Sequence, residues 1–261
     1  MKAIIKAIIA GSVIIGVGLI ILVIALALNG WKFMPKFEMV SFTAEGEIGE
    51  LKIDNAVGNV KTEFYDGDKI TVEYPVSERY SASVEEKEGV LTVSGLNKKH
   101  WYSFTFLPAT LPETLIKIPK NNVLKLDVTV NAGKVELAAG EYEKAQFKVN
   151  AGSLVAHGVS CPELKCEVNA GSISLKEVES ASLDCKVSAG SFHADRINCP
   201  LVNVKVSAGS VNLKMAGNKE EYTILVDTSA GSCNLASKTG TDPNKKIDID
   251  VSAGSVNVSF I

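Results

Sequence analysis

The sequence predicts an all-β fold: a single-stranded parallel β-helix (β-solenoid) of about seven regular coils with an N-terminal β cap, preceded by one transmembrane α-helix. Three observations predict it. A glycine recurs at nearly constant spacing through the second half of the chain, apolar and polar residues alternate on both sides of each such glycine, and a long uncharged run lies near the N-terminus. These features divide the chain into residues 1–36, 37–120 and 121–261.

The N-terminal segment, residues 1–36, holds an uncharged run from Ala7 to Leu28. About 20 apolar residues cross a bilayer as a helix, so this run predicts a single membrane span. A cleaved signal peptide is the alternative, because Ala25-Leu26-Ala27 fits a cleavage site. The run is longer than the usual signal core, which favours an uncleaved anchor, but cleavage stays open. We therefore expect a single-pass cell-membrane protein with most of the chain extracytoplasmic.

Residues 37–120 alternate less regularly and predict an irregular N-terminal β cap. The stretch from Leu51 to Tyr74 resembles a degenerate coil, with Gly58 in the corner position. Ser81 to Gly95 alternates around Glu88-Gly89, a dipeptide that favours a hairpin turn. A cap is expected on physical grounds, because the terminal units of a repeat array have an otherwise uncovered face.

Residues 121–261 contain the repeats. Each repeat is centred on an Asn/Ser-Ala-Gly corner, and the spacing is 19 residues four times in a row and then 22 and 23. The structural corner glycines are Gly133, Gly152, Gly171, Gly190, Gly209, Gly231 and Gly254. Glycine is expected at a corner because it takes positive φ easily, and the Asn or Ser before it can bond up a ladder.

The residues that flank each corner alternate with a period of two. In the repeat around Gly171, Leu164, Cys166, Val168 and Ile173 are apolar, while Lys165, Glu167 and Ser172 beside them are polar. This is the pattern of strands with one buried face. A repeat this short cannot bury a core alone, and stacking the repeats in parallel keeps every apolar column in register.

The five cysteines predict buried thiols rather than a disulfide framework. Cys166 and Cys185 are expected as neighbours in one inward column, close enough for a disulfide. Because neighbouring repeats carry valine and phenylalanine in that column, we favour two thiols. Their redox state, and the hand of the coil, stay open.

Two segments carry a resemblance to a known family. They are "IDNAVGNVKTEFYDGDKITVEY" (residues 53–74) and "TLIKIPKNNVLKLDVTVNAGKVEL" (residues 114–137), followed by the glycine-cornered repeats. The sequence resembles the bacterial putative-adhesin family, a domain of unknown function with β-strand repeats. The resemblance implies a β-helix on the bacterial envelope, in some relatives behind a membrane anchor or linked to envelope-stress responses. The family has no agreed catalytic residues, so none is carried over.

The sequence predicts a non-enzymatic envelope protein, with no catalytic, cofactor-binding or metal-binding residues. Its net charge of −3, with 27 basic and 30 acidic residues interspersed, argues against nucleic acid. The three histidines lack the spacing of metal ligands. Asp227 and Asp250 share a polar column, the arrangement that a polysaccharide-cleaving alternative would use.

The expected role is an adhesin-like binding or scaffolding surface. The partners expected are the membrane, through the single span, and an envelope protein or glycan, while the oligomeric state stays open. A stress-sensing component acting through a membrane-protein partner is the alternative. The candidate interaction surface is an aromatic and basic cluster outside the repeat columns. It consists of Lys98, Lys99, His100, Trp101 and Tyr102.

Overall fold

The computed structural model describes residues 16–18, 20–21, 23–24, 36–78, 80–98 and 111–261. The predicted all-β class is confirmed, because residues 36–78, 80–98 and 111–261 form one 19-stranded sheet and one short 3-10 helix, η1 (Lys219–Glu221). The strands are β1 (Glu38–Thr43), β2 (Glu50–Asn55), β3 (Asn59–Tyr65), β4 (Thr71–Val76), β5 (Tyr80–Lys87), β6 (Val90–Lys98), β7 (Glu113–Pro119), β8 (Leu124–Val130), β9 (Lys134–Leu137), β10 (Gly140–Val149), β11 (Ser153–Val168), β12 (Ser172–Val187), β13 (Ser191–Asn198), β14 (Leu201–Val206), β15 (Ser210–Met215), β16 (Thr223–Thr228), β17 (Ser232–Cys233), β18 (Lys246–Val251) and β19 (Ser255–Phe260).

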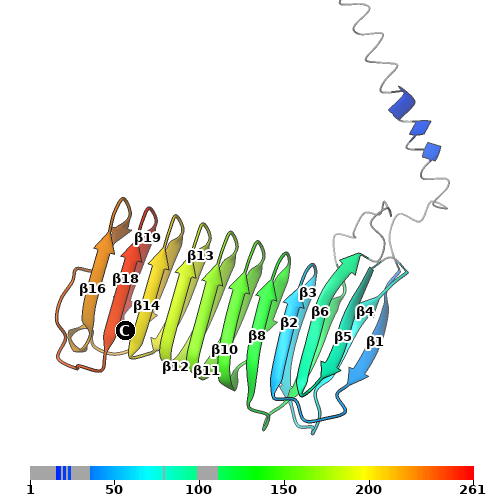
Figure 1. The fold of residues 1–261 in the computed structure, drawn as a ribbon, viewed down its shortest axis with the longest axis horizontal. Helices are drawn as coiled ribbons and strands as arrows, with labels where there is room; N and C mark the ends of the chain where they lie inside the picture. The colour runs from blue at the N-terminus through cyan, green and yellow to red at the C-terminus, as the bar shows by residue number, and fades with distance from the viewer. Residues whose placement is uncertain (1–15, 19, 22, 25–35, 79, 99–110) are drawn as a thin grey trace, which may run out of the picture.

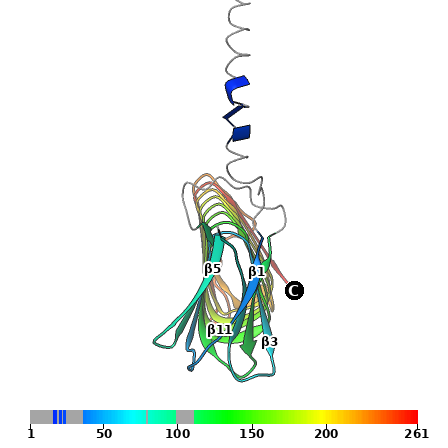
Figure 2. The ribbon, with the colours of Figure 1, turned by 90° about the vertical axis from the view of Figure 1, so that its right-hand side faces the viewer.

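The sheet winds around an enclosed interior and presents two long faces (Figure 1, Figure 2). The first, here called the charged face, runs β5–β6–β2–β8–β10–β11–β12–β14–β18–β16. The opposite face runs β1–β4–β7–β3–β9–β11–β12–β13–β15–β19–β17. The long strands β11 and β12 belong to both faces, and β4 pairs with β5 where the faces meet at the N-terminal end.

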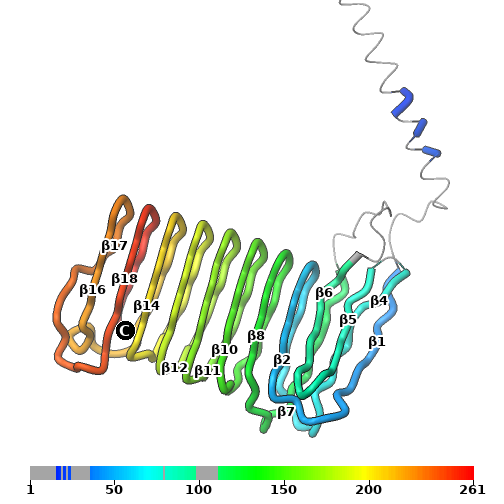
Figure 3. Tube along the Cα trace, viewed as in Figure 1, coloured from blue at the N-terminus to red at the C-terminus, as the bar shows by residue number. Residues whose placement is uncertain are grey.

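The prediction of a regular parallel β-helix (β-solenoid) with an N-terminal membrane helix is wrong. The sheet is mixed, because β1, β4 and β5 pair antiparallel with their neighbours. The strands are also not stacked in chain order (Figure 3). β18 lies between β14 and β16, and β2 lies between β6 and β8. The apolar columns of β16 and β18 are alike, so the sequence pattern does not determine which of the two pairs with β14.

The predicted transmembrane helix over residues 7–28 falls mainly outside the described residues. Within that run, residues 16–18, 20–21 and 23–24 are described and helical. Across the described part of the chain, none of the helices has the length and apolar character needed to cross a membrane.

Most of the interior is one apolar cluster that extends from Ala44 near the first strands to Val258 in the last, and a small second cluster of Tyr80, Ala82 and Leu96 lies on β5 and β6. The alternation of the sequence is what builds it, because every second side chain of a strand points to the same face. In β14, for example, Val202, Val204 and Val206 are buried while the residues between them face out. The predicted hairpin turn is confirmed: Glu88 and Gly89 both have positive φ and connect the antiparallel strands β5 and β6.

The corners of the repeat stack require glycine for a reason other than the expected one. Among the seven corner glycines, a positive φ is found at Gly133. At the later corners a Cβ would overlap backbone instead: at Gly190 it would meet the carbonyl oxygen of Gly171 in the neighbouring turn. Glycine is therefore required there because the corners stack too closely for any side chain.

Asparagine side chains form a hydrogen-bonded ladder along this corner. Nδ2 of Asn150 donates to Oδ1 of Asn131 over 2.7 Å, and Nδ2 of Asn169 donates to Oδ1 of Asn150 over 2.7 Å. Nδ2 of Asn131 donates in turn to Oδ1 of Asp54 in β2 over 3.0 Å. The ladder joins the repeat stack to the N-terminal strands.

Replacing Asn150 by alanine is expected to lower the free energy of unfolding by about 1 to 2 kcal/mol, because it removes two ladder hydrogen bonds. Urea unfolding followed by circular dichroism measures the loss. Ser207→Ala is the matched control, since Ser207 is an exposed residue in the corresponding position of another corner. Equal losses in the two variants would show that the ladder contributes nothing of its own.

The cysteines are free thiols. Cys166 and Cys185 are register partners in neighbouring strands, as expected, and both are buried. Burial raises the pKa of Cys166 well above its usual value and the pKa of Cys199 to about 11. Cys233 is the one cysteine that is partly exposed.

At pH 8 we expect the folded chain to react with a thiol reagent at Cys233 alone, because buried thiols stay protonated and inaccessible. In urea all five cysteines should react. Thiol titration of the native and unfolded chain checks this. Fast reaction of Cys166 or Cys185 in the folded chain would mean that the interior opens readily.

Candidate interaction groove

The predicted interaction surface lies almost wholly outside the described residues. Lys98 is the last residue of β6, whereas Lys99, His100, Trp101 and Tyr102 are not among the residues that the structure describes. That surface therefore stays a prediction. The corner glycines lie in one column along the edge between the two faces, where each backbone meets the next.

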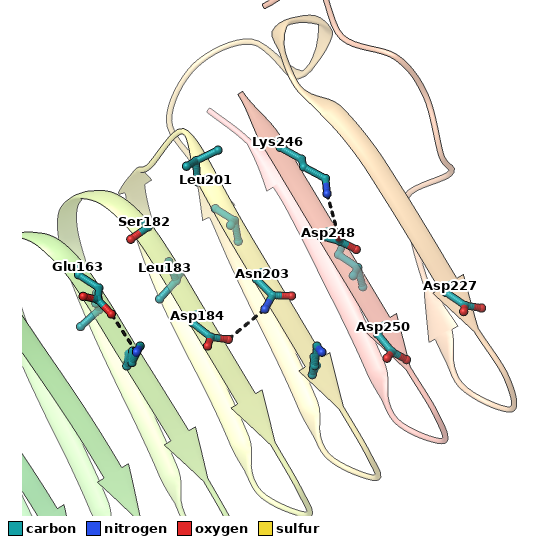
Figure 4. Close-up of a pocket in the computed structure, with 15 residues that line it drawn as sticks. Glu163, Ser182, Leu183, Asp184, Leu201, Asn203, Asp227, Lys246, Asp248 and Asp250 are labelled. Carbon is teal, nitrogen blue, oxygen red and sulfur yellow. Dashed lines mark hydrogen bonds and ion pairs between the residues drawn. The ribbon is translucent and has the colours of Figure 1, made fainter. Parts of the chain in front are cut away.

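A shallow groove with a volume of 550 Å³ lies on the charged face near its C-terminal end (Figure 4). Its lining comes from five strands, β11, β12, β14, β18 and β16, which are adjacent in the sheet although β14 and β18 are far apart in sequence. The lining residues are Glu163, Leu164, Lys165, Ser182, Leu183, Asp184, Leu201, Val202, Asn203, Lys205, Asp227, Lys246, Asp248, Ile249 and Asp250.

Several polar side chains that line this groove on β11, β12 and β14 are paired with polar neighbours. Glu163 forms ion pairs of 2.9 Å with both Lys165 and Lys144. The hydrogen bonds from Lys165 and Lys144 lower the pKa of the Glu163 carboxyl, and the bond with Glu163 raises the pKa of Lys165. Nδ2 of Asn203 donates to Oδ1 of Asp184 over 3.1 Å. These contacts hold the side chains in place across neighbouring strands.

A row of four charges without such pairing runs across the charged face, and all but Lys186 line the groove. Lys186, Lys205, Asp250 and Asp227 are cross-strand neighbours in that order, on β12, β14, β18 and β16. All four are exposed, and none forms an ion pair with another described residue. We call these four residues the charge row. Figure 4 shows Asp250 and Asp227 side by side on their two strands.

Two exposed leucines lie on the same face. Leu201 at the start of β14 is 48% exposed, and Leu225 in β16 is 43% exposed. Leu201 is the register partner of Lys246, and Leu225 is the register partner of Asp248. Lys246 and Asp248 form an ion pair of 2.9 Å. The groove thus combines apolar contact area with charges that have no partner of their own, which suits contact with another macromolecule.

The sequence anticipates part of this site. Asp227 and Asp250 share a column by spacing alone, and the structure confirms that they are register partners. The sequence does not predict that Lys205 and Asp250 are neighbours, because their pairing depends on the insertion of β18 beside β14. In the described part of the chain, no group of three or more His, Cys, Asp or Glu side chains is placed to hold a metal ion.

Comparison with solved structures finds several that are similar to this chain. A putative lipid binding protein from Parabacteroides distasonis is 13% identical, with 85% of this chain and 96% of that chain covered and a TM-score of 0.53. A putative adhesin from Parabacteroides merdae is 13% identical over 85% and 96% of the two chains, with a TM-score of 0.46. A putative adhesin from P. distasonis is 14% identical over 85% and 97%, with a TM-score of 0.44. At these identities the likeness concerns the fold alone.

None of the curated proteins matches the sequence. A family model described as Toastrack DUF4097 matches residues 48–260, which is most of the chain. The match confirms the resemblance to a family of unknown function with β-strand repeats, and it does not bear on the predicted membrane anchor. The chain belongs to the Toastrack DUF4097 family.

Proposed function

We propose that this chain is a non-enzymatic protein of the bacterial cell envelope whose charged face serves as an adhesin-like binding surface. The observation that carries the proposal is the groove, which is lined both by the exposed Leu201 and by three members of the charge row, Lys205, Asp227 and Asp250. Exposed apolar side chains surrounded by polar ones are typical of protein interaction surfaces. The groove is wide and shallow, whereas sites for small molecules usually enclose most of their ligand.

The position of the groove supports the same role. Its lining residues lie on strands paired on both sides, apart from β16 at the end of the sheet. Segment 234–245 covers the outer edge of β16, where Ile224 and Lys238 form an antiparallel bridge and the Ser237 hydroxyl accepts from the Val226 N–H over 2.9 Å. A surface fixed in this way binds without first being ordered, which favours affinity.

Location at the cell membrane, with the sheet on the extracytoplasmic side, belongs to the same proposal. It is supported by the apolar composition of residues 7–28. Fractionation of cells that express the full chain, followed by protease treatment of intact cells, tests it. Protection of the sheet in intact cells and its digestion after lysis would contradict this location. The stress-sensing alternative has no specific observation in its favour among the described residues.

Binding of the full chain to purified envelope fractions, one of cell-wall glycan and one of membrane protein, tests the function. Leu201→Asp should weaken binding to the fraction that is recognised by at least about tenfold, because it places a charge in the apolar part of the contact. Asn257→Asp is the matched control, an exposed charge introduced on β19 of the opposite face. Equal effects of the two variants, with both folded, would refute the assignment of the surface to the charged face.

A further inference from the structure

The order of charges in the charge row has a symmetry of its own. Two lysines, Lys186 and Lys205, are followed by two aspartates, Asp250 and Asp227, on four adjacent strands. Neighbouring strands are about 4.8 Å apart, so the four charges are evenly spaced along a line across the sheet. The row changes sign at its midpoint, between β14 and β18. A line of charges with this pattern is complementary to its own reverse.

We infer that the charge row is a contact between two copies of this chain, packed with their charged faces together about a two-fold axis. The axis lies between the faces, parallel to the strands, and passes between β14 and β18. It places Lys205 opposite Asp250 of the second copy and Lys186 opposite Asp227 of the second copy. An isologous interface of this kind uses one patch twice, so it needs a patch that is complementary to itself. The inference rests on the proposed function, because it names the partner of the same groove.

The charges also fix the register of such a pair. If the axis moved by half a strand spacing to β14, Lys205 would face Lys205 of the second copy. If it moved the same distance to β18, Asp250 would face Asp250. Like charges placed opposite each other disfavour those arrangements, so a single register pairs all four residues.

Two further rows of cross-strand neighbours, which lie two and four residues before the charge row on each strand, are compatible with this register. In the middle row, Asn203 would face Asp248 of the second copy, and Asp184 would face Leu225. In the remaining row, Leu201 would face Lys246, whose alkyl chain can lie along an apolar side chain. Neither row sets two like charges against each other. We expect the association to be weak and to decrease with added salt, because it depends on ion pairs between side chains that are exposed in each copy.

Charge-reversal variants of the full chain test the inference. K186D/K205D makes the row wholly acidic and D227K/D250K makes it wholly basic, so each variant alone should self-associate at least about tenfold more weakly than the unchanged chain. An equimolar mixture of the two should form a mixed dimer. The fourfold swap K186D/K205D/D227K/D250K should self-associate like the unchanged chain. Sedimentation velocity in one mild detergent at low and high salt measures each dissociation constant.

K176D is the matched control, because Lys176 is exposed on β12 on the opposite face, and it should leave self-association unchanged. The inference would be overturned if the unchanged chain does not self-associate. It would also be overturned if both double variants still self-associate. Loss in the double variants without recovery in the mixture would overturn it as well. If the double variants keep self-association but no longer bind the envelope fractions, the inference fails while the proposed function stands. Loss of self-association in each double variant, with recovery in the mixture, supports it, whether or not binding to the envelope fractions is kept.

Discussion

Replacing Gly190 by valine should lower the free energy of unfolding by about 3 kcal/mol, the upper end of what overpacking usually costs. A Cβ at position 190 would overlap the carbonyl oxygen of Gly171, and it would lie 3.1 Å from the Gly171 nitrogen. Both are backbone atoms of the neighbouring turn, so no side chain can move aside. The same carbonyl accepts the N–H of Ser191 over 3.0 Å, so a displaced corner also loses a hydrogen bond.

Gly49→Ala is the matched control for this prediction. Gly49 has open space where its Cβ would lie, and its φ is not positive. We expect a change of no more than about 0.5 kcal/mol in the free energy of unfolding. Urea unfolding of the full chain, followed by far-UV circular dichroism, compares the two variants. Similar losses would mean that the cost at Gly190 reflects the general effect of replacing glycine and not the close approach of stacked corners.

The sequence predicts the local structure of this chain better than the order of its strands. The period-two columns identify the buried residues of β14 and place Cys166 beside Cys185, because both follow from the 19-residue spacing. The position of β18 does not follow, because Ile247 and Ile249 of β18 pair equally with Val202 and Val204 on one side and with Ile224 and Val226 on the other. Identical apolar columns leave the order of stacking undetermined, so the predicted regular stack in chain order was wrong.

In the candidate site, too, the local pattern follows from the sequence but the arrangement of the strands does not. The signs of the charge row can be obtained from the sequence, since one polar column contains Lys186, Lys205, Asp227 and Asp250 in chain order. In the structure β18 lies between β14 and β16, so Asp250 comes before Asp227 along the row. Because both residues are aspartates, the order of the charges stays the same. The groove could not be predicted, because its shape depends on which strands are neighbours and on how far Leu201 protrudes. The aromatic and basic cluster around Trp101 was predicted as an interaction surface from its composition, and it lies almost wholly outside the described residues.

Replacing Phe147 by alanine is expected to lower the free energy of unfolding by about 3 to 5 kcal/mol, because it leaves a cavity in a fully buried position. Phe147 lies in β10, and its register partners are Val128 of β8 and Cys166 of β11. These neighbours belong to paired strands on both sides, so the backbone cannot move inward to fill the space. Phe147→Leu retains more of the buried volume and should lose less.

Gln146→Ala is the control on the same strand, because Gln146 is exposed and should change the free energy of unfolding by no more than about 0.5 kcal/mol. Each turn of the sheet contacts mainly the turns beside it, so the loss at Phe147 should be local. Hydrogen exchange should therefore accelerate most in β8, β10 and β11, and least in β18 and β19. Uniform acceleration along the whole chain would mean instead that the main apolar cluster unfolds as one cooperative unit, with no local opening below the global free energy.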